Sequence, residues 1–146
     1  MTPFGPDVAA VFWPMCALAL LTAIVWAWMY VDRIGEMRSK HIAPQRLPTA
    51  REAATILEHT AAADNFRNLF ELPVLFYALC LALAATELAS TLQLALAWAY
   101  VALRALHSFI HVTYNRVSHR FTVHLASTLC LFFMWGVFAI DLARRD

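Results

Sequence analysis

Long apolar stretches alternate with short charged ones along this 146-residue chain. An α-helix needs about 20 mainly apolar residues to cross the hydrocarbon core of a bilayer, which is about 30 Å thick. Four stretches meet or approach this requirement, and we expect them to be transmembrane helices at residues 8–31, 61–85, 88–111 and 121–140. The pattern predicts an all-α integral membrane protein, a four-helix bundle that forms a single domain over residues 1–146.

The second of these spans has polar residues at its entrance. Its clearly apolar part, Leu72–Ala85, is shorter than a membrane-crossing helix requires. The span must therefore recruit residues from about Ala61 onward. This requirement draws Arg67 and Glu71 into the cytoplasmic third of the bilayer.

The segment between the first two spans is predicted to be irregular at first and helical later. Residues 32–48 are charged and contain one glycine and two prolines, which is typical of a loop. Thr49 with Glu52 three residues later forms the pattern of a capping box, so a helix should begin there. We expect that helix to continue through residues 53–66 into the membrane.

The composition agrees with a membrane protein. Hydrophobic residues make up 62% of the chain and charged residues 14%, whereas soluble domains average about 45–50% and about 25%. The net charge of +1 and the absence of a basic patch give no sign of a nucleic-acid partner. The three cysteines lie in separate apolar stretches, which excludes the spacing of a disulfide framework or a zinc site.

The distribution of Lys and Arg predicts the orientation of the bundle. Basic residues collect in the first loop and in the connector after the third span, whereas the opposite side has only Arg144 and Arg145. Loops rich in Lys and Arg stay on the cytoplasmic side of a membrane. Both termini are therefore expected to be non-cytoplasmic.

Polar side chains gather at one depth on three of the predicted helices. On an α-helix, Asp64, Arg67, Asn68 and Glu71 share one face. The third span carries a similar stripe, and the fourth opens with a basic residue: Arg104, His107, His111 and Arg120. An ionisable side chain inside the bilayer costs roughly 2.5–3.5 kcal/mol, so such groups must face one another or water.

This cluster has two interpretations. Arg67 and Glu71 can pair across one helical turn, and the polar groups then only hold the helices together. Alternatively, the cluster lines a ligand pocket, in which three arginines bind carboxylates and Glu71 accepts from an ammonium group. Pro73 favours the second interpretation, since it removes a backbone N–H and bends the helix beside the cluster. A small zwitterion with several carboxylates would fit such a pocket.

Two segments carry a resemblance to a known family. "RNLFELP" at residues 67–73 and "LRALHSFIHVTYNRVSHR" at residues 103–120 resemble the MAPEG family, the membrane-associated proteins of eicosanoid and glutathione metabolism. The residues of the second segment are most similar to those of the bacterial inner-membrane branch. The resemblance implies a left-handed four-helix bundle, assembled as a homotrimer in the lipid bilayer, with glutathione bound between subunits near the cytoplasmic face.

The resemblance also implies roles for individual residues. By position, Arg67, Asn68, Glu71 and His107 would contact glutathione, and Arg120 would be the catalytic arginine that stabilises the glutathione thiolate. The implied activity is that of a glutathione-dependent transferase or peroxidase, because a thiolate can add to a lipophilic electrophile or reduce a lipid hydroperoxide. The lipophilic small molecule itself is not specified by the sequence.

The chain departs from the family pattern at two positions. His111 stands where the prostaglandin synthase branch has a tyrosine, and Asp64 stands where that branch has an arginine. Both departures weaken an anion site, and Asp64 would put a negative charge near a glutathione carboxylate. They favour an alternative function, a non-catalytic lipid-binding or scaffold subunit of the same fold.

A metal site is a third hypothesis, and we give it less weight. His107 and His111 are four residues apart on one helical face, a common spacing of metal ligands, and other side chains could complete the set: His119, His124, Asp64 and Glu71. A pair of histidines beside arginines is more often hydrogen-bonded than bound to metal. We therefore predict no metal.

Overall fold

The computed structural model describes residues 9–47, 49–58 and 60–145. Its elements are helical: α2 (Phe12–Ser39), the short 3-10 helix η1 (Pro44–Arg46), α3 (Ala50–Ile56), α4 (Ala61–Asn68), α5 (Leu72–Thr86), α6 (Thr91–Val112) and α7 (Val117–Ala143). Four segments are long and apolar enough to cross a membrane, namely α2, α4 together with α5, α6, and α7. The predicted all-α membrane fold is confirmed.

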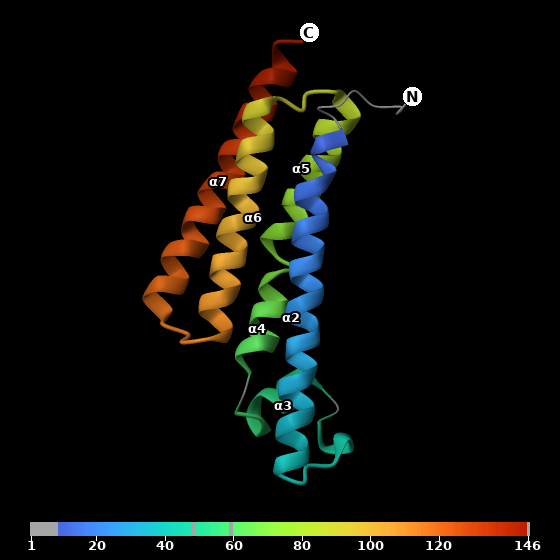
Figure 1. Ribbon diagram of the computed structural model, residues 1–146, viewed down its shortest axis with the longest axis vertical. Coiled ribbons are helices and arrows are strands. Elements are labelled where there is room, and N and C mark those ends of the chain that lie inside the picture. Colours follow the sequence, from blue (N-terminus) through green and yellow to red (C-terminus); the bar gives the residue numbers. More distant parts are fainter. Residues whose placement is uncertain (1–8, 48, 59, 146) are drawn as a thin grey trace.

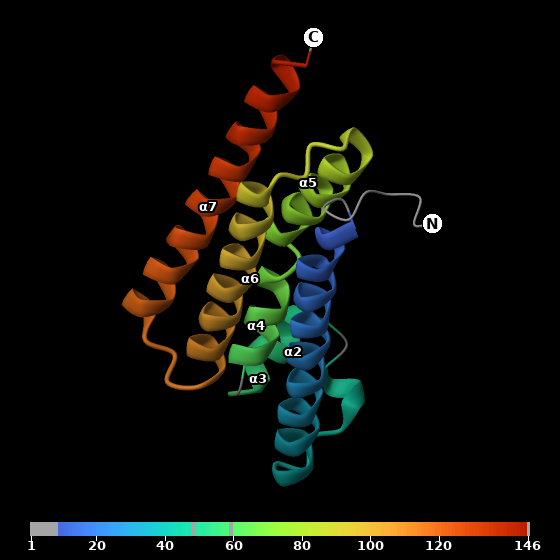
Figure 2. The same ribbon diagram turned by 45° about the horizontal axis from the view of Figure 1, so that its top comes forward.

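The helices form one elongated bundle (Figures 1 and 2). α6 and α7 lie side by side and antiparallel, while α2 packs against α4, α5 and α6. The α5–α6 connection and the end of α7 lie at one end of the bundle, and the α6–α7 turn lies at the other. The last part of α2 extends past that turn and is accompanied there by α3.

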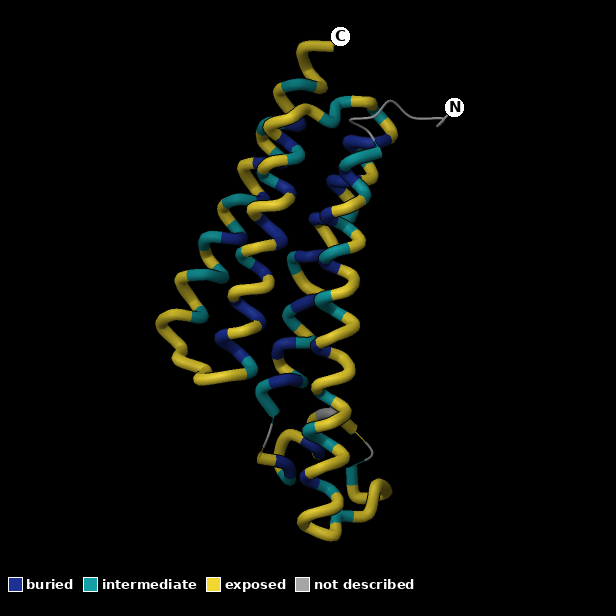
Figure 3. The backbone as a smooth tube through the Cα atoms, in the orientation of Figure 1, coloured by how far each residue is buried: buried dark blue, intermediate teal, exposed yellow. Residues whose placement is uncertain are grey.

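The core is narrow and the outer surface is apolar. Buried side chains such as Leu18, Phe76 and Leu131 face the inside of the bundle, whereas Trp98 and Phe132 are exposed on its outside. Figure 3 shows buried positions along the inner faces of the helices and exposed positions along the outer faces. An outer surface of large apolar side chains suits contact with lipid tails rather than water.

The structure corrects the prediction that residues 32–48 form a loop. α2 continues through Ser39, so the non-helical segment begins only at Lys40. The Lys40 Nζ atom lies 2.7 Å from Glu36 Oε1 across one helical turn, and an oppositely charged pair at this spacing stabilises a helix. The side chains of Glu36 and Lys40 thus favour a helix that extends beyond the apolar run.

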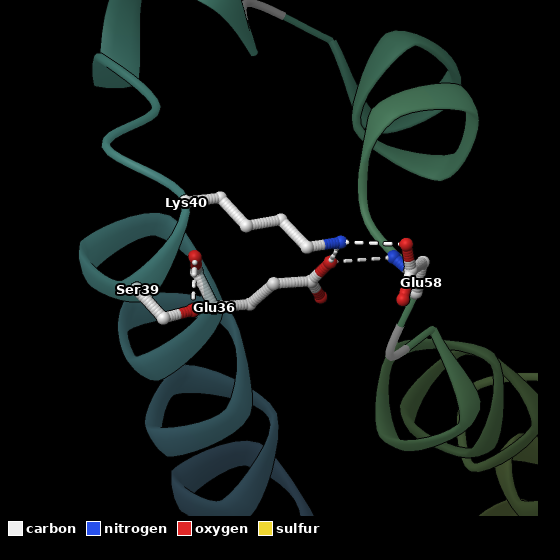
Figure 4. Close-up of polar contacts among 4 residues, drawn as sticks. All are labelled: Glu36, Ser39, Lys40 and Glu58. Atoms are coloured by element: carbon white, nitrogen blue, oxygen red, sulfur yellow. Dashed lines mark hydrogen bonds and ion pairs between the residues drawn. The ribbon is translucent and has the colours of Figure 1, made fainter.

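The prediction of one continuous helix from Thr49 into the membrane is also wrong. The capping box is present, because Thr49 Oγ1 accepts from the Glu52 N–H and the Glu52 carboxylate accepts from the Thr49 N–H. However, α3 ends at Ile56. The N–H of Glu58 donates to Glu36 Oε1 of α2 at 2.7 Å instead of to a carbonyl of its own helix (Figure 4).

Three side chains from two segments make up this contact, which we call the Glu36 clamp: Glu36, Lys40 and Glu58. The Lys40 Nζ atom bridges the two carboxylates, at 2.7 Å from Glu36 Oε1 and 2.9 Å from Glu58 Oε1. Figure 4 shows the clamp joining the end of α2 to the chain after α3. It fixes α3 beside α2.

A local hydrogen bond marks the start of α6, and α7 begins earlier than predicted. α6 starts at Thr91, because the Ser90 hydroxyl accepts from the Gln93 N–H at 3.2 Å. The connector to α7 is shorter than predicted and covers only residues 113–116. α7 begins at Val117 rather than near residue 121, so Arg120 lies within its first turn.

Candidate functional site

The polar site is built around an interruption between α4 and α5. α4 ends at Asn68 and α5 resumes at Leu72, with Glu71 as the N-cap residue in a non-helical backbone conformation. Pro73 occupies the first turn of α5, where a proline is tolerated because the first N–H groups of a helix have no helical partner. The interruption is larger than the bend that Pro73 predicts from the sequence.

The interruption leaves the Asn68 carbonyl available to another helix. Arg104 of α6 donates from Nη2 to this carbonyl oxygen at 3.0 Å. Its Nη1 lies 3.2 Å from His124 Nδ1 of α7. The Arg104 side chain is fully buried, so one guanidinium joins α4, α6 and α7 inside the bundle.

A second arginine joins the ends of α6 and α7. Arg120 Nη1 donates to Asn115 Oδ1 at 2.8 Å and lies 3.1 Å from His111 Nε2. The backbone carbonyl of Arg120 lies 3.2 Å from His107 Nδ1. The side chain and the backbone of Arg120 therefore position both histidines of α6.

These contacts define the protonation of the three histidines. A guanidinium only donates, so His111 Nε2 and His124 Nδ1 must be acceptors, and both rings are neutral. A carbonyl only accepts, so His107 Nδ1 carries a proton. His107 Nε2 is buried and has no hydrogen-bond partner among the described residues.

A cavity of about 220 Å³ opens beside the interruption. We call it the break pocket, and its lining residues come from both sides of the interruption and from α6 and α7: Asn68, Glu71, His107, Val117, Arg120, Phe121 and His124. Its lining includes a carboxylate, an amide, a guanidinium and two imidazole rings. Such a set recognises a ligand that carries both charges and a hydrogen-bond donor.

The structure brings together most of the predicted site residues. Asn68, Glu71, His107 and Arg120 line the break pocket. Arg104 and His111 lie behind this lining and hold His124 and Arg120 in place.

Arg67 lies elsewhere. It lines a different cavity between α2, α3 and α4, together with Asp64. Arg67 Nη1 is 4.0 Å from Asp64 Oδ1, whereas the Glu71 side chain has no hydrogen bond or ion pair with the described residues. The Arg67–Glu71 pair does not form, since the helix is interrupted between them, and the Asp64 carboxylate is outside the break pocket.

Two features of the polar site were not predicted from the sequence. His124 was considered only as a metal ligand, although it follows Arg120 by four residues and must share its helical face. Buried Ser108 donates to Asn65 Oδ1 at 3.2 Å and adds a second polar link between α6 and α4. In the part of the chain that the structure describes, no group of three or more His, Cys, Asp or Glu side chains could hold a metal ion.

Fold and site together define a membrane protein of four spanning segments with a polar pocket between its helices near one end of the bundle. The family model of the MAPEG family matches residues 11–140, which is most of the chain. The chain therefore belongs to the MAPEG family. No curated protein and no solved structure matches it.

Proposed function

We propose that this protein is a glutathione-dependent transferase or peroxidase of the membrane, which acts on lipophilic electrophiles or lipid hydroperoxides. Its family works in glutathione and eicosanoid metabolism. The observation that carries the proposal is the break pocket, which is lined by the side chains of Glu71, Arg120 and His107.

The groups of the pocket complement those of glutathione. The Glu71 carboxylate suits the ammonium group, and the Asn68 amide can donate to a carboxylate or accept from a peptide N–H. A neutral imidazole of the lining can accept the thiol proton, while Arg120 stabilises the negative charge that develops on sulfur. Nucleophilic attack by the thiolate then forms the new bond to the electrophile, and the leaving group departs with its electron pair.

The size of the pocket supports a site shared between subunits. Its volume of about 220 Å³ lies below the roughly 300–1,000 Å³ of typical ligand sites. Val117 and Phe121 at its rim are 66% and 63% exposed, so a neighbouring copy can pack there and complete the site. We therefore keep the homotrimer as part of the proposal, and the detergent-corrected mass of the purified complex tests it.

A second function, that of a non-catalytic lipid-binding or scaffold subunit, is favoured by one observation. Arg120 Nη1 already donates to His111 and Asn115, which leaves fewer donors for a thiolate. Under this alternative, the exposed apolar side chains of the rim contact a fatty acid or a membrane partner, and the polar groups stabilise the bundle.

Calorimetric titration of the purified protein with glutathione, followed by a conjugation assay with an aromatic electrophile, separates the two functions. We expect binding, turnover, and a thiolate absorbance at about 240 nm. Arg120→Ala should remove the absorbance and the turnover. Arg116→Ala is the matched control, because Arg116 is exposed and does not line the pocket.

Each outcome of these assays bears on one of the functions. Binding without turnover would support the scaffold alternative. An absence of glutathione binding in the parent protein would contradict both the assignment of the pocket and the enzyme function.

A further inference from the structure

A second polar cavity lies outside the break pocket, between α2, α3 and α4. Its volume is about 280 Å³, and we call it the α2–α4 cavity. Three of its lining residues are charged, Arg33, Asp64 and Arg67, and most of the others are apolar, among them Met29, Leu57 and Phe66. None of these residues lines the break pocket, although the family resemblance implies a glutathione contact for Arg67.

The two arginines of this cavity are expected to lie at a similar depth in the membrane. Arg33 follows the start of α2 at Phe12, and Arg67 precedes the end of α5 at Thr86, by nearly equal numbers of residues. At 1.5 Å per residue both distances are about 30 Å, the thickness of the hydrocarbon core. Both guanidinium groups are therefore expected near the level of the lipid phosphates.

The cavity has a defined third wall. Ala53 and Leu57 of the α3 segment are buried and line the cavity. The Glu36 clamp holds this segment against α2, through the bond from the Glu58 N–H to Glu36 Oε1 at 2.7 Å (Figure 4). The wall is thus fixed to the end of a membrane helix.

The charges of the cavity are incompletely paired. The Arg33 side chain makes no hydrogen bond or ion pair with the described residues. Arg67 Nη1 comes no closer than 4.0 Å to Asp64 Oδ1, and the two side chains are 63% and 52% exposed. Two guanidinium groups can bind a phosphate, and the Asp64 carboxylate can accept from an ammonium group. We propose that the α2–α4 cavity binds the headgroup of an aminophospholipid, which carries a phosphate and a primary ammonium.

Aromatic side chains beside the cavity favour a lipid over a soluble molecule. Trp26 and Tyr30 of α2 are exposed and pack edge to face, with ring centroids 5.0 Å apart. Phe66 of α4, in the cavity lining, packs in the same way on exposed Phe70 at 5.0 Å. Aromatic rings at the membrane boundary contact both headgroups and acyl chains, so they can hold the chains of a lipid whose headgroup occupies the cavity.

Native mass spectrometry of the detergent-purified protein tests the proposal. Phosphatidylethanolamine, phosphatidylcholine and phosphatidylglycerol with identical acyl chains are added separately. We expect about tenfold tighter binding of phosphatidylethanolamine, because only its ammonium group has N–H donors for a carboxylate. Phosphatidylglycerol lacks an ammonium group and should bind weakly.

Variants assign the binding to this cavity. Arg33→Gln should weaken phosphatidylethanolamine binding about tenfold, and Asp64→Asn should abolish the preference over phosphatidylcholine. Arg38→Gln is the matched control, because Arg38 is exposed on the same helix but does not line the cavity. Ala54→Phe adds volume to the cavity without a change of charge and should also weaken binding.

Several results would overturn the proposal. Equal binding of the three lipids, or stronger binding of phosphatidylglycerol, would exclude an aminophospholipid site. Equally tight binding of soluble glycerophosphoethanolamine would show that no lipid is required. Glutathione titration of Arg33→Gln keeps this test separate from the proposed enzyme function, since an unchanged affinity is expected there.

Discussion

Arginines rather than histidines carry the positive charge of the break pocket. Arg104 and Arg120 each donate to a histidine, and a histidine that accepts a hydrogen bond on one nitrogen is neutral. His107 donates from Nδ1 to a backbone carbonyl, and its buried Nε2 has no hydrogen-bond partner among the described residues. The only carboxylate in the lining belongs to Glu71. Single residues thus give the pocket a fixed pattern of charge.

The position of Glu71 leads to a first prediction. Glu71→Gln should weaken glutathione binding about tenfold, since the variant loses the charge that faces the ammonium group. Its thermal stability should change little, because the exposed Glu71 side chain has no hydrogen bond or ion pair with described residues. Calorimetric titration and thermal unfolding measure the two effects.

Arg67→Gln provides the comparison for Glu71→Gln. The family resemblance assigns Arg67 to glutathione, whereas the structure places it in the α2–α4 cavity. A reduced glutathione affinity in Arg67→Gln would support the assignment by resemblance, and an unchanged affinity would support the separation of the two cavities. Equal affinities of Glu71→Gln and the parent would contradict the role of Glu71.

Burial of Arg104 leads to a second prediction. Arg104→Met removes the donors to the Asn68 carbonyl and to His124, and leaves two partly buried acceptors without partners. We expect a loss of about 2–4 kcal/mol in the free energy of unfolding. Reversible unfolding in mixed micelles measures it, with Arg116→Met as a control that should change stability by less than about 0.5 kcal/mol. Similar stability of the two variants would contradict the structural role of Arg104.

Two interruptions of helix, one on either side of α4, shape the polar end of the second span. The interruption between α4 and α5 frees the Asn68 carbonyl and opens the break pocket. At the interruption between α3 and α4, the Glu58 N–H donates to Glu36 of another helix. Both interruptions are thus accompanied by hydrogen bonds to other helices.

Pro73 is expected to maintain the interruption between α4 and α5. Pro73→Ala supplies an N–H that can donate to the carbonyl of Leu69, as in a continuous helix. We predict slower amide hydrogen exchange at residues 70–74 and weaker glutathione binding. Pro44→Ala is the control, because Pro44 lies in η1 and is exposed. Unchanged exchange would show that the contact between Arg104 and Asn68 alone maintains the interruption.

The Glu36 clamp gives a pH-dependent prediction. Hydrogen bonds to Glu36 and Glu58 raise the pKa of Lys40 above the ordinary lysine value of 10.5. A raised pKa in the folded state means that the stabilisation is complete below pH 10.5 and is lost as the pH rises through the raised pKa.

Lys40→Met tests this clamp. The variant should have a lower Tm than the parent at pH 8, and the difference should disappear at a pH above the raised pKa of Lys40. Trypsin should also cleave the variant faster after Arg46 and Arg51, which lie in the segment that the clamp holds. Arg38→Met is the control. A Tm difference that persists at high pH would contradict the ion-pair origin of the effect.

At the scale of the whole molecule, the two ends of the bundle differ in chemistry. One end contains the α6–α7 turn, the Glu36 clamp and both polar cavities, and the other contains the α5–α6 connection. The first end also has most of the basic residues. Such an asymmetry orients a protein in the membrane, so we predict that the end with the cavities faces the cytoplasm.

Reporter fusions in bacterial cells measure this orientation. Alkaline phosphatase, which is active only outside the cytoplasm, should be active when fused after Asp146 and inactive when fused after Arg46. Replacing Arg38 and Arg46 with Gln should reduce the asymmetry and increase the fraction of inverted molecules. Activity of the fusion at Arg46 in the parent protein would contradict the predicted topology.

Much of the architecture can be predicted from the sequence, because the thickness of the bilayer sets the length of each spanning helix. An apolar run must be long enough to cross the hydrocarbon core, and this requirement is local in sequence. The capping box at Thr49 is equally local, and it forms as expected. The polar stripe of α6 was likewise visible, because 3.6 residues per turn place Arg104, His107 and His111 on one face.

By itself, the sequence determined a membrane bundle of four apolar segments with polar groups at one depth. Tertiary structure decided how those groups divide between two cavities, where α3 ends, and which nitrogen of His107 remains free. The physical reason is that these features depend on hydrogen bonds between distant segments, such as Glu58 to Glu36 and Arg104 to Asn68. Helical periodicity predicts which residues share a face, but the partners of that face come from other helices.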